Sequence, residues 1–279
     1  MIRDIFVPLL RNSSDEAALD AAVALAERHQ AHLSALITVE NPMPVVSDLG
    51  YVALDVDQEL LAQARQSAAQ LVAKTRERLA RTALSTEVRT TETMMLWSEE
   101  SAAMQARHAD LTVLGGRDPG ATGPQFALNF KSLLLQSGRP LLMVPPGARL
   151  NLPIRRVVLA WKPSREASRA LHDALPLLSP DSEVDVLMID PQVGEGGHGQ
   201  QPGADIAVHL ARHGFKVRVL SQPNQGQSAG NAILTHLREA DADLLVMGGY
   251  GHARWREAVL GGCTRTVLDE AKTPVLFAH

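Results

Sequence analysis

The sequence of this chain repeats itself, and a repeat of this length indicates that one domain has been duplicated. The matching segments are 3–9 with 155–161, 14–22 with 164–171, 109–116 with 242–249, and 139–144 with 273–278. In each half an apolar run is followed by Ser14 or Ser164 and then by helix-forming residues. This order predicts a strand, a turn and an N-capped helix at the start of both halves.

The length of the chain, 279 residues, suits two copies of about 140 residues each, close to the commonest domain size. Between the copies, the stretch PPGARLNLP at 145–153 is rich in proline and has no apolar periodicity, as is typical of a connector. We therefore predict one domain at 1–148 and a second at 153–279.

Apolar runs and helical patterns alternate along both halves. The predicted strands are 4–10, 32–39, 84–90, 110–115 and 140–145 in the first half, and 155–161, 183–190, 215–221, 243–248 and 274–278 in the second. The predicted helices include 14–30, 55–82, 97–108, 127–137 and 203–213. Such alternation predicts an α/β fold, in which each half is a Rossmann-like, doubly wound domain with a five-stranded parallel sheet flanked by helices.

The composition excludes several classes of protein. Apolar residues make up 45% and charged residues 21%, and the net charge of −4 provides no basic surface for nucleic acid. A single cysteine, Cys263, rules out an internal disulfide. No apolar run approaches the ~20 residues of a membrane span, and the first residues do not resemble a signal peptide. We expect a cytoplasmic protein without nucleic-acid or membrane partners.

Two groups of glycines in the second half point to a bound anion. Gly248 and Gly251 follow the apolar run at 243–248, and Gly261 and Gly262 precede an apolar-periodic helix. Glycine lets backbone amides approach a ligand closely, and the free amides and dipole at a helix start attract a negative charge. The alternative is that these glycines only allow a tight turn and close packing.

The pattern G-x-x-G, nine residues, G and a small residue, closed by a Pro-Val-Leu strand, resembles the nucleotide loop of the universal stress protein family. With the repeat, the whole chain except the connector resembles a tandem universal stress protein. The resemblance implies that ATP, with magnesium, is the candidate cofactor and that the backbone amides of Gly248, Gly251, Gly261 and Gly262 hold it. Family members that bind nucleotide carry Ser or Thr where Gly262 stands here, and Thr264 is a candidate substitute.

The sequence also departs from the family at the end of the first strand, where an acidic residue is usual. Lys162 stands there in the second half and Leu10 in the first. Lys162 is a candidate ligand for an anion, or else a solvated turn residue. His252, followed by Arg254 and Arg256, can line the phosphate end or face water. Since the glycine spacing is lost in the first half, we predict that this half binds no nucleotide.

Other motifs predict less. The string at 194–199 formally matches G-x-G-x-x-G but follows the wrong strand, so we interpret it as a linker. His209 and His213 share a helix face and can chelate a cation or stay solvated, without a visible third ligand. The remaining histidines, His172 and His236 among them, are expected singly on helix surfaces or turns. Cys263 either packs against the glycine turn or is a reactive thiol. We predict no metal site and no catalytic residues.

These observations favour a stress-response protein that acts by binding and regulation, with weak adenine-nucleotide binding in the second half and an unknown protein partner. One alternative is an enzyme that hydrolyses or transfers nucleotides, although no base or metal-binding carboxylate is aligned for it. Another is a ligand-free interaction module. In the family the closing strands, 141–144 and 275–278 here, commonly pair between domains, and we expect that pairing within this chain. We further expect a homodimer of tandem chains.

Overall fold

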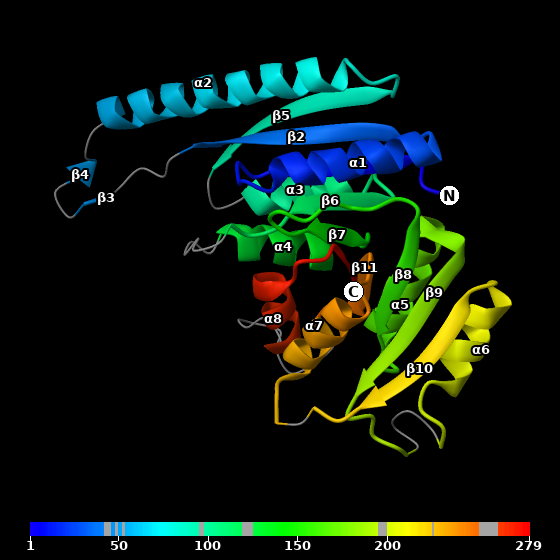
Figure 1. Cartoon of the computed structure of the whole chain (residues 1–279). Helices are drawn as coiled ribbons and strands as arrows, with labels where there is room; N and C mark the ends of the chain where they lie inside the picture. The colour runs from blue at the N-terminus through cyan, green and yellow to red at the C-terminus, as the bar shows by residue number, and fades with distance from the viewer. Residues whose placement is uncertain are drawn as a thin grey trace.

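The computed structural model describes residues 1–41, 46–47, 50–51, 54–94, 98–118, 125–194, 200–224, 226–250 and 262–279. In that part of the chain, strands and helices alternate as the sequence predicts (Figure 1). The elements of the first half are β1 (Asp4–Leu9), α1 (Asp15–His29), β2 (His32–Asn41), β3 (Val46–Ser47), β4 (Gly50–Tyr51), α2 (Leu54–Leu79), β5 (Thr86–Met94), α3 (Ser98–Ala106), β6 (Leu111–Gly115), α4 (Gln125–Gln136) and β7 (Leu141–Val144).

The second half follows the same order without the short β3–β4 hairpin. Its elements are β8 (Ile154–Ala160), α5 (Arg165–Ala174), a 3-10 turn (Leu175–Leu177), β9 (Leu178–Ile189), α6 (Ala204–Arg212), β10 (Lys216–Gln222), α7 (Ala229–Glu239), β11 (Leu244–Gly248), α8 (Gly262–Glu270) and β12 (Val275–Ala278).

All strands except the β3–β4 hairpin form one ten-stranded sheet in the order β10-β9-β8-β11-β12-β7-β6-β1-β2-β5. Within each half the strands are parallel and lie in the order third, second, first, fourth, fifth. The halves join where β7 pairs with β12 antiparallel, with Leu142 opposite Leu276. The predicted fold class and the pairing of the closing strands within the chain are both confirmed.

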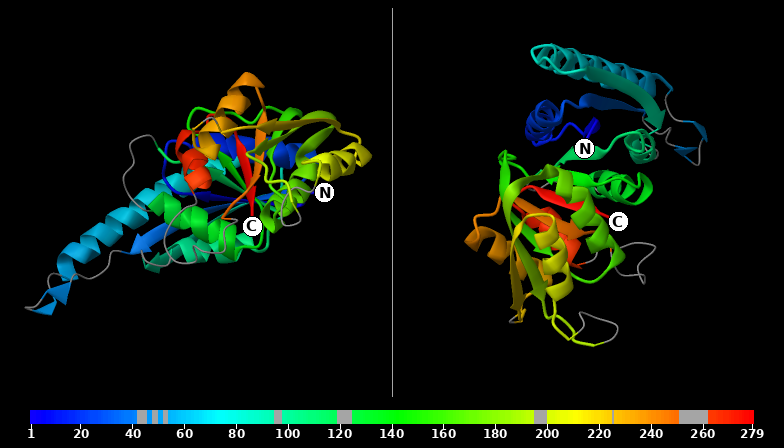
Figure 2. Two further views of the ribbon diagram at one scale, coloured as in Figure 1. Left: turned by 90° about the horizontal axis from the view of Figure 1, so that it is seen from below. Right: turned by 90° about the vertical axis from the view of Figure 1, so that its right-hand side faces the viewer.

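Helices cover both faces of this sheet, and each face has its own apolar core. One core takes buried residues from α1, α2, α5 and α6, and the other from α3, α4, α7 and α8. Each core therefore contains residues of both halves. In the second core the rings of Phe130 and Phe277 meet edge to face with centres 5.0 Å apart. At the outer end of the sheet α2 extends beyond the other helices (Figure 2).

Two aspartates show the duplication at the level of single hydrogen bonds. Asp110 Oδ2 accepts bonds of 2.7 and 3.2 Å from the backbone amides of Arg3 and Asp4. Asp243 Oδ2 makes the equivalent pair, at 3.0 and 2.9 Å, with two amides at the start of β8. Each aspartate ties the start of the fourth strand to the start of the first.

The two predicted N-caps have different outcomes. Ser164 caps α5, since its hydroxyl oxygen accepts the N–H of Ala167 at 3.2 Å. Ser14 does not cap α1 with its side chain, because its backbone is already helical. Its hydroxyl has no partner among the described residues, and its N–H donates to Asn12 Oδ1 at 3.1 Å. The prediction of a serine N-cap was therefore wrong for α1.

Candidate functional site

The candidate site lies where β8 and β11 end side by side. These strands are parallel neighbours, with Ala160 opposite Met247. The next strands of each unit, β9 and β12, lie on opposite sides of this pair. Open α/β sheets bind ligands where the strand order reverses in this way, outside the carboxyl ends of the strands. Lys162 follows β8 and Gly248 ends β11, so the structure brings both predicted residues to this edge.

Packing requires Gly248 at the end of β11, and the next residue, Gly249, makes a close contact with a leucine side chain. A Cβ on Gly248 would lie 2.7 Å from the backbone nitrogen of Ala167, in the first turn of α5. A Cβ on Gly249 would lie 2.5 Å from Cδ2 of Leu134, which belongs to α4 of the first half. Gly249 also donates its N–H to the carbonyl of Ala278 at 2.9 Å. Close packing thus explains both glycines without a ligand.

Gly262 differs from these two glycines. It is the first residue of α8, it is exposed, and a Cβ there would meet no atom of the described residues within 4 Å, its chain neighbours and own helix apart. Packing therefore gives no reason for a glycine at this position, whereas the start of a helix offers free amides to an anion. Thr264 is buried, with 5% of its surface exposed, so its hydroxyl is not on the open side where Gly262 lies.

Close contact with α7 fixes the position of α8. A Cβ on Gly230 of α7 would lie 2.7 Å from Cβ of Thr266 and 3.2 Å from the carbonyl oxygen of Cys263. The hydroxyl of Thr266 donates to the carbonyl of Gly262 at 2.9 Å. Burial raises the pKa of the Cys263 thiol to about 11, so this cysteine is a packing residue and not an acidified, reactive thiol.

Lys162 and Glu166 bring opposite charges to the β8 side of the edge. Lys162 is exposed, in a turn where its carbonyl accepts the N–H of Ser164 at 2.6 Å. Glu166 is buried, and its Cβ lies 2.9 Å from where a Cβ of Gly248 would be. Burial is the largest single influence on the pKa of Glu166 and would raise it. Two hydrogen bonds, from its own amide and from the Ser164 hydroxyl, act in the opposite direction together with the charge of His279. Their combined effect is larger, so the pKa is lowered. Glu166, an anionic residue whose carboxylate lies 3.5 Å from the guanidinium of Arg165, therefore packs its Cβ against Gly248.

Glu166 is the site residue that sequence reasoning missed. The family's acidic residue is expected at the end of the first strand, the position of Lys162, and Glu166 lies one helical turn later. A glutamate two residues after the predicted N-cap Ser164 is the signal that could have found it. The predicted residues Gly251, His252 and Gly261 lie outside the described residues.

In the first half, Ser13 and Asp118 close the equivalent edge. Asp118 Oδ1 accepts hydrogen bonds from the N–H and the hydroxyl of Ser13, at 2.9 and 2.5 Å. A Cβ on Gly115 would lie 2.8 Å from the carbonyl carbon of Ser14, the same close approach that Gly248 makes to α5. The loop after β6 is thus bonded to the loop after β1, across the place where a ligand would enter.

A buried acid lies behind this closed edge. Asp15 Oδ2 accepts the backbone N–H of Arg11 at 2.7 Å, while Oδ1 has no hydrogen-bond partner among the described residues. Burial raises the pKa of Asp15 to about 6, although backbone hydrogen bonds oppose the increase. The first half thus keeps at its sheet edge a buried carboxyl group that holds its proton to a higher pH than an ordinary aspartate does.

The first half also contacts the helix that begins at Gly262. Arg117, in the loop after β6, places Nη1 3.2 Å from Oδ1 of Asp269 in α8. Asp269 is also 3.7 Å from Arg265, one turn earlier in the same helix. An ion pair therefore links the loop after β6 in the first half to α8 in the second half, the helix whose start is the candidate phosphate site.

His236 is not on the surface, contrary to the sequence expectation. It is 9% exposed, and its Nε2 lies 2.9 Å from Oδ2 of Asp185 in β9. The same carboxylate accepts two hydrogen bonds, of 2.7 and 2.8 Å, from the guanidinium of Arg218 in β10. The expectation failed because α7 packs this histidine over a buried strand carboxylate, which no local pattern shows.

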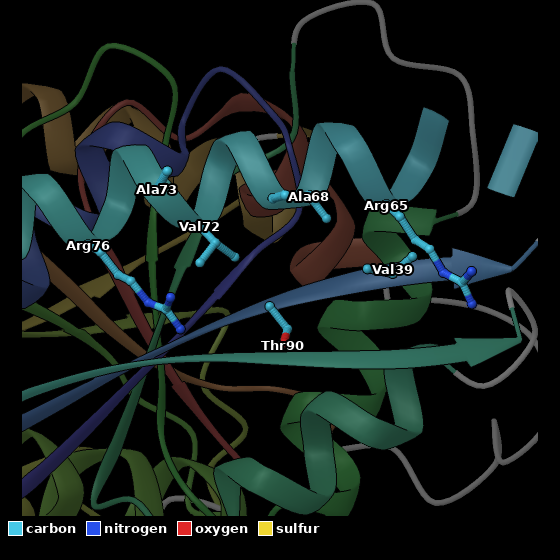
Figure 3. A pocket seen from close by; sticks show the side chains of 8 residues that line it. Val39, Arg65, Ala68, Val72, Ala73, Arg76 and Thr90 are labelled. Atoms are coloured by element: carbon cyan, nitrogen blue, oxygen red, sulfur yellow. The ribbon is translucent and has the colours of Figure 1, made fainter. Parts of the chain in front are cut away.

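Two hollows in the described surface lie away from the candidate site. One, of about 390 Å³, lies between α2 and the strands β2 and β5 (Figure 3). Val39, Ala68 and Val72 form its apolar floor, and Arg65 and Arg76 flank it. The other, of about 510 Å³, includes Arg3, Gln30 and Ser85, near the starts of β1, β2 and β5. Among the described helices, none has the length and apolar character that crossing a bilayer requires.

Comparison with known proteins agrees with this architecture. The model of the universal stress protein family matches twice, at residues 1–145 and 153–279. Universal stress protein Slr1230 from Synechocystis sp. (strain ATCC 27184 / PCC 6803 / Kazusa) is 27% identical over 173 residues, which cover 60% of this chain and 57% of that protein. This chain therefore matches only a little more than half the length of that relative.

Solved structures share the fold. A universal stress protein from Archaeoglobus fulgidus DSM 4304 has a TM-score of 0.69 at 16% identity, covering 99% of this chain and 95% of its own. A universal stress protein in complex with cAMP matches 45% of this chain and 97% of its own at 17% identity, with a TM-score of 0.34. With two family domains in one sequence, the chain belongs to the universal stress protein family as a tandem member.

Proposed function

We propose that the second half binds an adenine nucleotide weakly at the edge formed by β8, β11 and the start of α8, and that the protein serves a stress response by binding and regulation. The observation that carries this proposal is Gly262, an exposed glycine at the start of a helix with open space around its Cβ position. A helix start of this kind suits a phosphate group.

The proposed roles follow the positions of Gly248, Gly262 and Lys162 and, for Gly251, His252 and Gly261, the resemblance to the family loop. Gly248 and Gly262, together with Gly251 and Gly261, present backbone amides to the phosphates and ribose. Lys162 and His252 add positive charge, and Thr264 supports the turn from beneath, since it is buried. The first half serves as a structural partner, because Ser13 and Asp118 close its edge.

Glu166 makes magnesium part of the proposal. Glu166 packs against Gly248, and its negative charge at this edge repels phosphate oxygens unless a cation lies between them. Magnesium binds carboxylate and phosphate oxygens together. ATP is therefore expected to bind more tightly with magnesium than without it, and Glu166→Gln should reduce this difference.

Calorimetric titration of the untagged full-length protein with ATP, with and without magnesium, tests the proposal. Gly262→Ser restores the hydroxyl of nucleotide-binding members and is expected to tighten binding. Gly262→Asp places a negative charge at the same point and is expected to abolish it. Both side chains enter open space, so neither should change the unfolding midpoint. Equal affinities in all three proteins, or no heat at millimolar ATP, would contradict the proposal.

A ligand-free interaction module is the second candidate function. It is favoured by the finding that Gly248 and Gly249 are explained by packing alone. If no nucleotide binds under the conditions above, the shape of the edge is structural and the protein acts through its surface.

A further inference from the structure

Three histidines from two neighbouring helices meet on one face of the second half. His172 lies in the last turn of α5, His209 lies in α6, and His213 directly follows α6. The ring centres of His172 and His209 are 5.3 Å apart, and those of His209 and His213 are 4.8 Å apart. The sequence shows only the pair on α6, and the packing of α5 beside α6 adds the third ring (Figure 1).

These separations match those of imidazoles that share a metal ion. Zinc binds histidine nitrogen at about 2.0–2.1 Å with tetrahedral angles, which places the centres of two ligating rings roughly 5 Å apart. The rings are tilted relative to each other, at 47° and 64°. The spacing of the cluster is thus suitable for coordination.

One ring nitrogen of His172 already makes a hydrogen bond within its own helix. Its Nδ1 lies 2.8 Å from the carbonyl oxygen of Ser168, and because a carbonyl only accepts, Nδ1 carries the proton. In the neutral ring Nε2 then keeps its lone pair for another partner. A backbone carbonyl on the second nitrogen is the usual arrangement for a metal-binding histidine.

One ring nitrogen of His209 has no hydrogen-bond partner in the part of the chain that the structure describes. Its Nε2 is buried without a hydrogen-bond partner among the described residues, a situation that in native proteins often marks a bound water or ion. Burial, and then the charges of His213, His172 and Arg212, lower the pKa of His209.

We propose that His172, His209 and His213 bind one divalent transition-metal ion, with Zn²⁺ as the natural candidate. Among the described residues no three ligating side chains already stand in coordination geometry, so binding requires a ring to turn. His213 is exposed and can turn, while His172 keeps its hydrogen bond to Ser168 and His209 lies between the two. The charge of Arg212 opposes a cation, and we expect micromolar affinity.

This site is separate from the candidate nucleotide edge. His172 lies about one and a half turns beyond Glu166 along α5, toward the opposite end of the sheet. Metal binding is therefore expected with or without ATP, and failure of one proposal leaves the other standing.

Calorimetric titration of the untagged, chelator-treated full-length protein with zinc chloride tests the inference, since a polyhistidine tag would itself bind metal. We expect one site per chain, weakened about 10- to 100-fold by His172→Gln, His209→Gln or His213→Gln. His108→Gln, a change of an exposed histidine in the first half, is the matched control and should bind as the parent protein does. Circular dichroism without metal checks that the variants are folded.

Each other outcome overturns the proposal. No binding at 100-fold molar excess of zinc would show that the three rings are only solvated neighbours. Full affinity in His172→Gln would leave a two-histidine chelate on α6 alone. Loss of binding in Cys263→Ser, with the histidine variants unchanged, would place the metal at the thiol instead.

Discussion

Gly248 and Ala167 approach so closely that a Cβ on the glycine would lie 2.7 Å from the backbone nitrogen of the alanine. Gly262, in contrast, has no atom within 4 Å of its Cβ position. Gly248→Ala is therefore expected to lower the free energy of unfolding by about 1–3 kcal/mol. Gly262→Ala is expected to leave it unchanged or raise it by up to about 1 kcal/mol. Urea unfolding of the two variants checks this, and equal losses would contradict it.

The buried acid Asp15 makes stability depend on pH. Its pKa is about 6 in the folded protein, above the ordinary 3.8, so the folded state binds more protons than the unfolded state between these values. Stability therefore falls as the pH rises from about 4 to 6, and the whole penalty is present above pH 6. Asp15→Asn removes this penalty, so the free energy of unfolding is expected to rise by up to about 3 kcal/mol at pH 7.5.

Urea unfolding of Asp15→Asn at pH 4 and pH 7.5 separates this effect from a general one. The gain should be present at pH 7.5 and absent at pH 4. If the free energy of unfolding changes equally at both pH values, the substitution acts through packing and not through the ionisation of Asp15.

The carboxylate of Asp185 is shared by His236 and Arg218. Among the described residues, its hydrogen bonds come from these two side chains. Removing the charge with Asp185→Asn is expected to cost about 2–4 kcal/mol, because a charge-assisted bidentate pair and a buried bond are lost together. Arg218→Ala should cost less, since the arginine side chain is 68% exposed and His236 still bonds to the carboxylate. Chemical denaturation of both variants measures the two losses of unfolding free energy. A larger loss in Arg218→Ala than in Asp185→Asn would contradict this prediction.

The apolar core that contains Phe130 and Phe277 spans both halves, so the halves are expected to unfold together. Phe130→Ala should lower the unfolding free energy by about 3–5 kcal/mol while the transition stays single. Phe126→Ala is the control, because that ring is only partly buried and stacks on Phe130 at 6.3 Å. Calorimetry that resolves two transitions in the parent protein would show that the halves are independent.

Self-association must use a surface other than the closing strands, because β7 and β12 already pair with each other. The remaining sheet edges are β5 and β10, and Val219 of β10 is 40% exposed. We expect a homodimer by light scattering and its loss in Val219→Lys, since a charge on an edge strand blocks pairing. Val208→Lys, at a position on α6 that is 51% exposed, should not disturb it. A monomer at high concentration would exclude the dimer.

The strands were predictable because parallel strands buried on both faces are continuous apolar runs. Leu244 to Met247 are all buried, and their sequence contains nothing but apolar residues. The start of β9 was not predictable, because Ser179 and Ser182 within it look like turn residues. The structure buries both, and Ser182 donates its hydroxyl to the carbonyl of Ile154 at 2.8 Å.

The candidate site was predictable only as a pattern of glycines. The sequence does not distinguish Gly248, which packing requires, from Gly262, which packing leaves free. Glu166 escaped because its closeness to Gly248 comes from the docking of α5 on β11. His172 and His209 meet for a similar reason, through tertiary contacts between helices that no local spacing encodes.

The antiparallel pairing of β7 with β12 has an evolutionary consequence. Two identical subunits joined through such a seam must carry identical pockets, since one gene specifies both. When the seam lies inside one polypeptide, each copy accumulates its own substitutions while the partner keeps the shared architecture intact. The bonded loops of Ser13 and Asp118 on one side and the open helix start at Gly262 on the other illustrate that freedom.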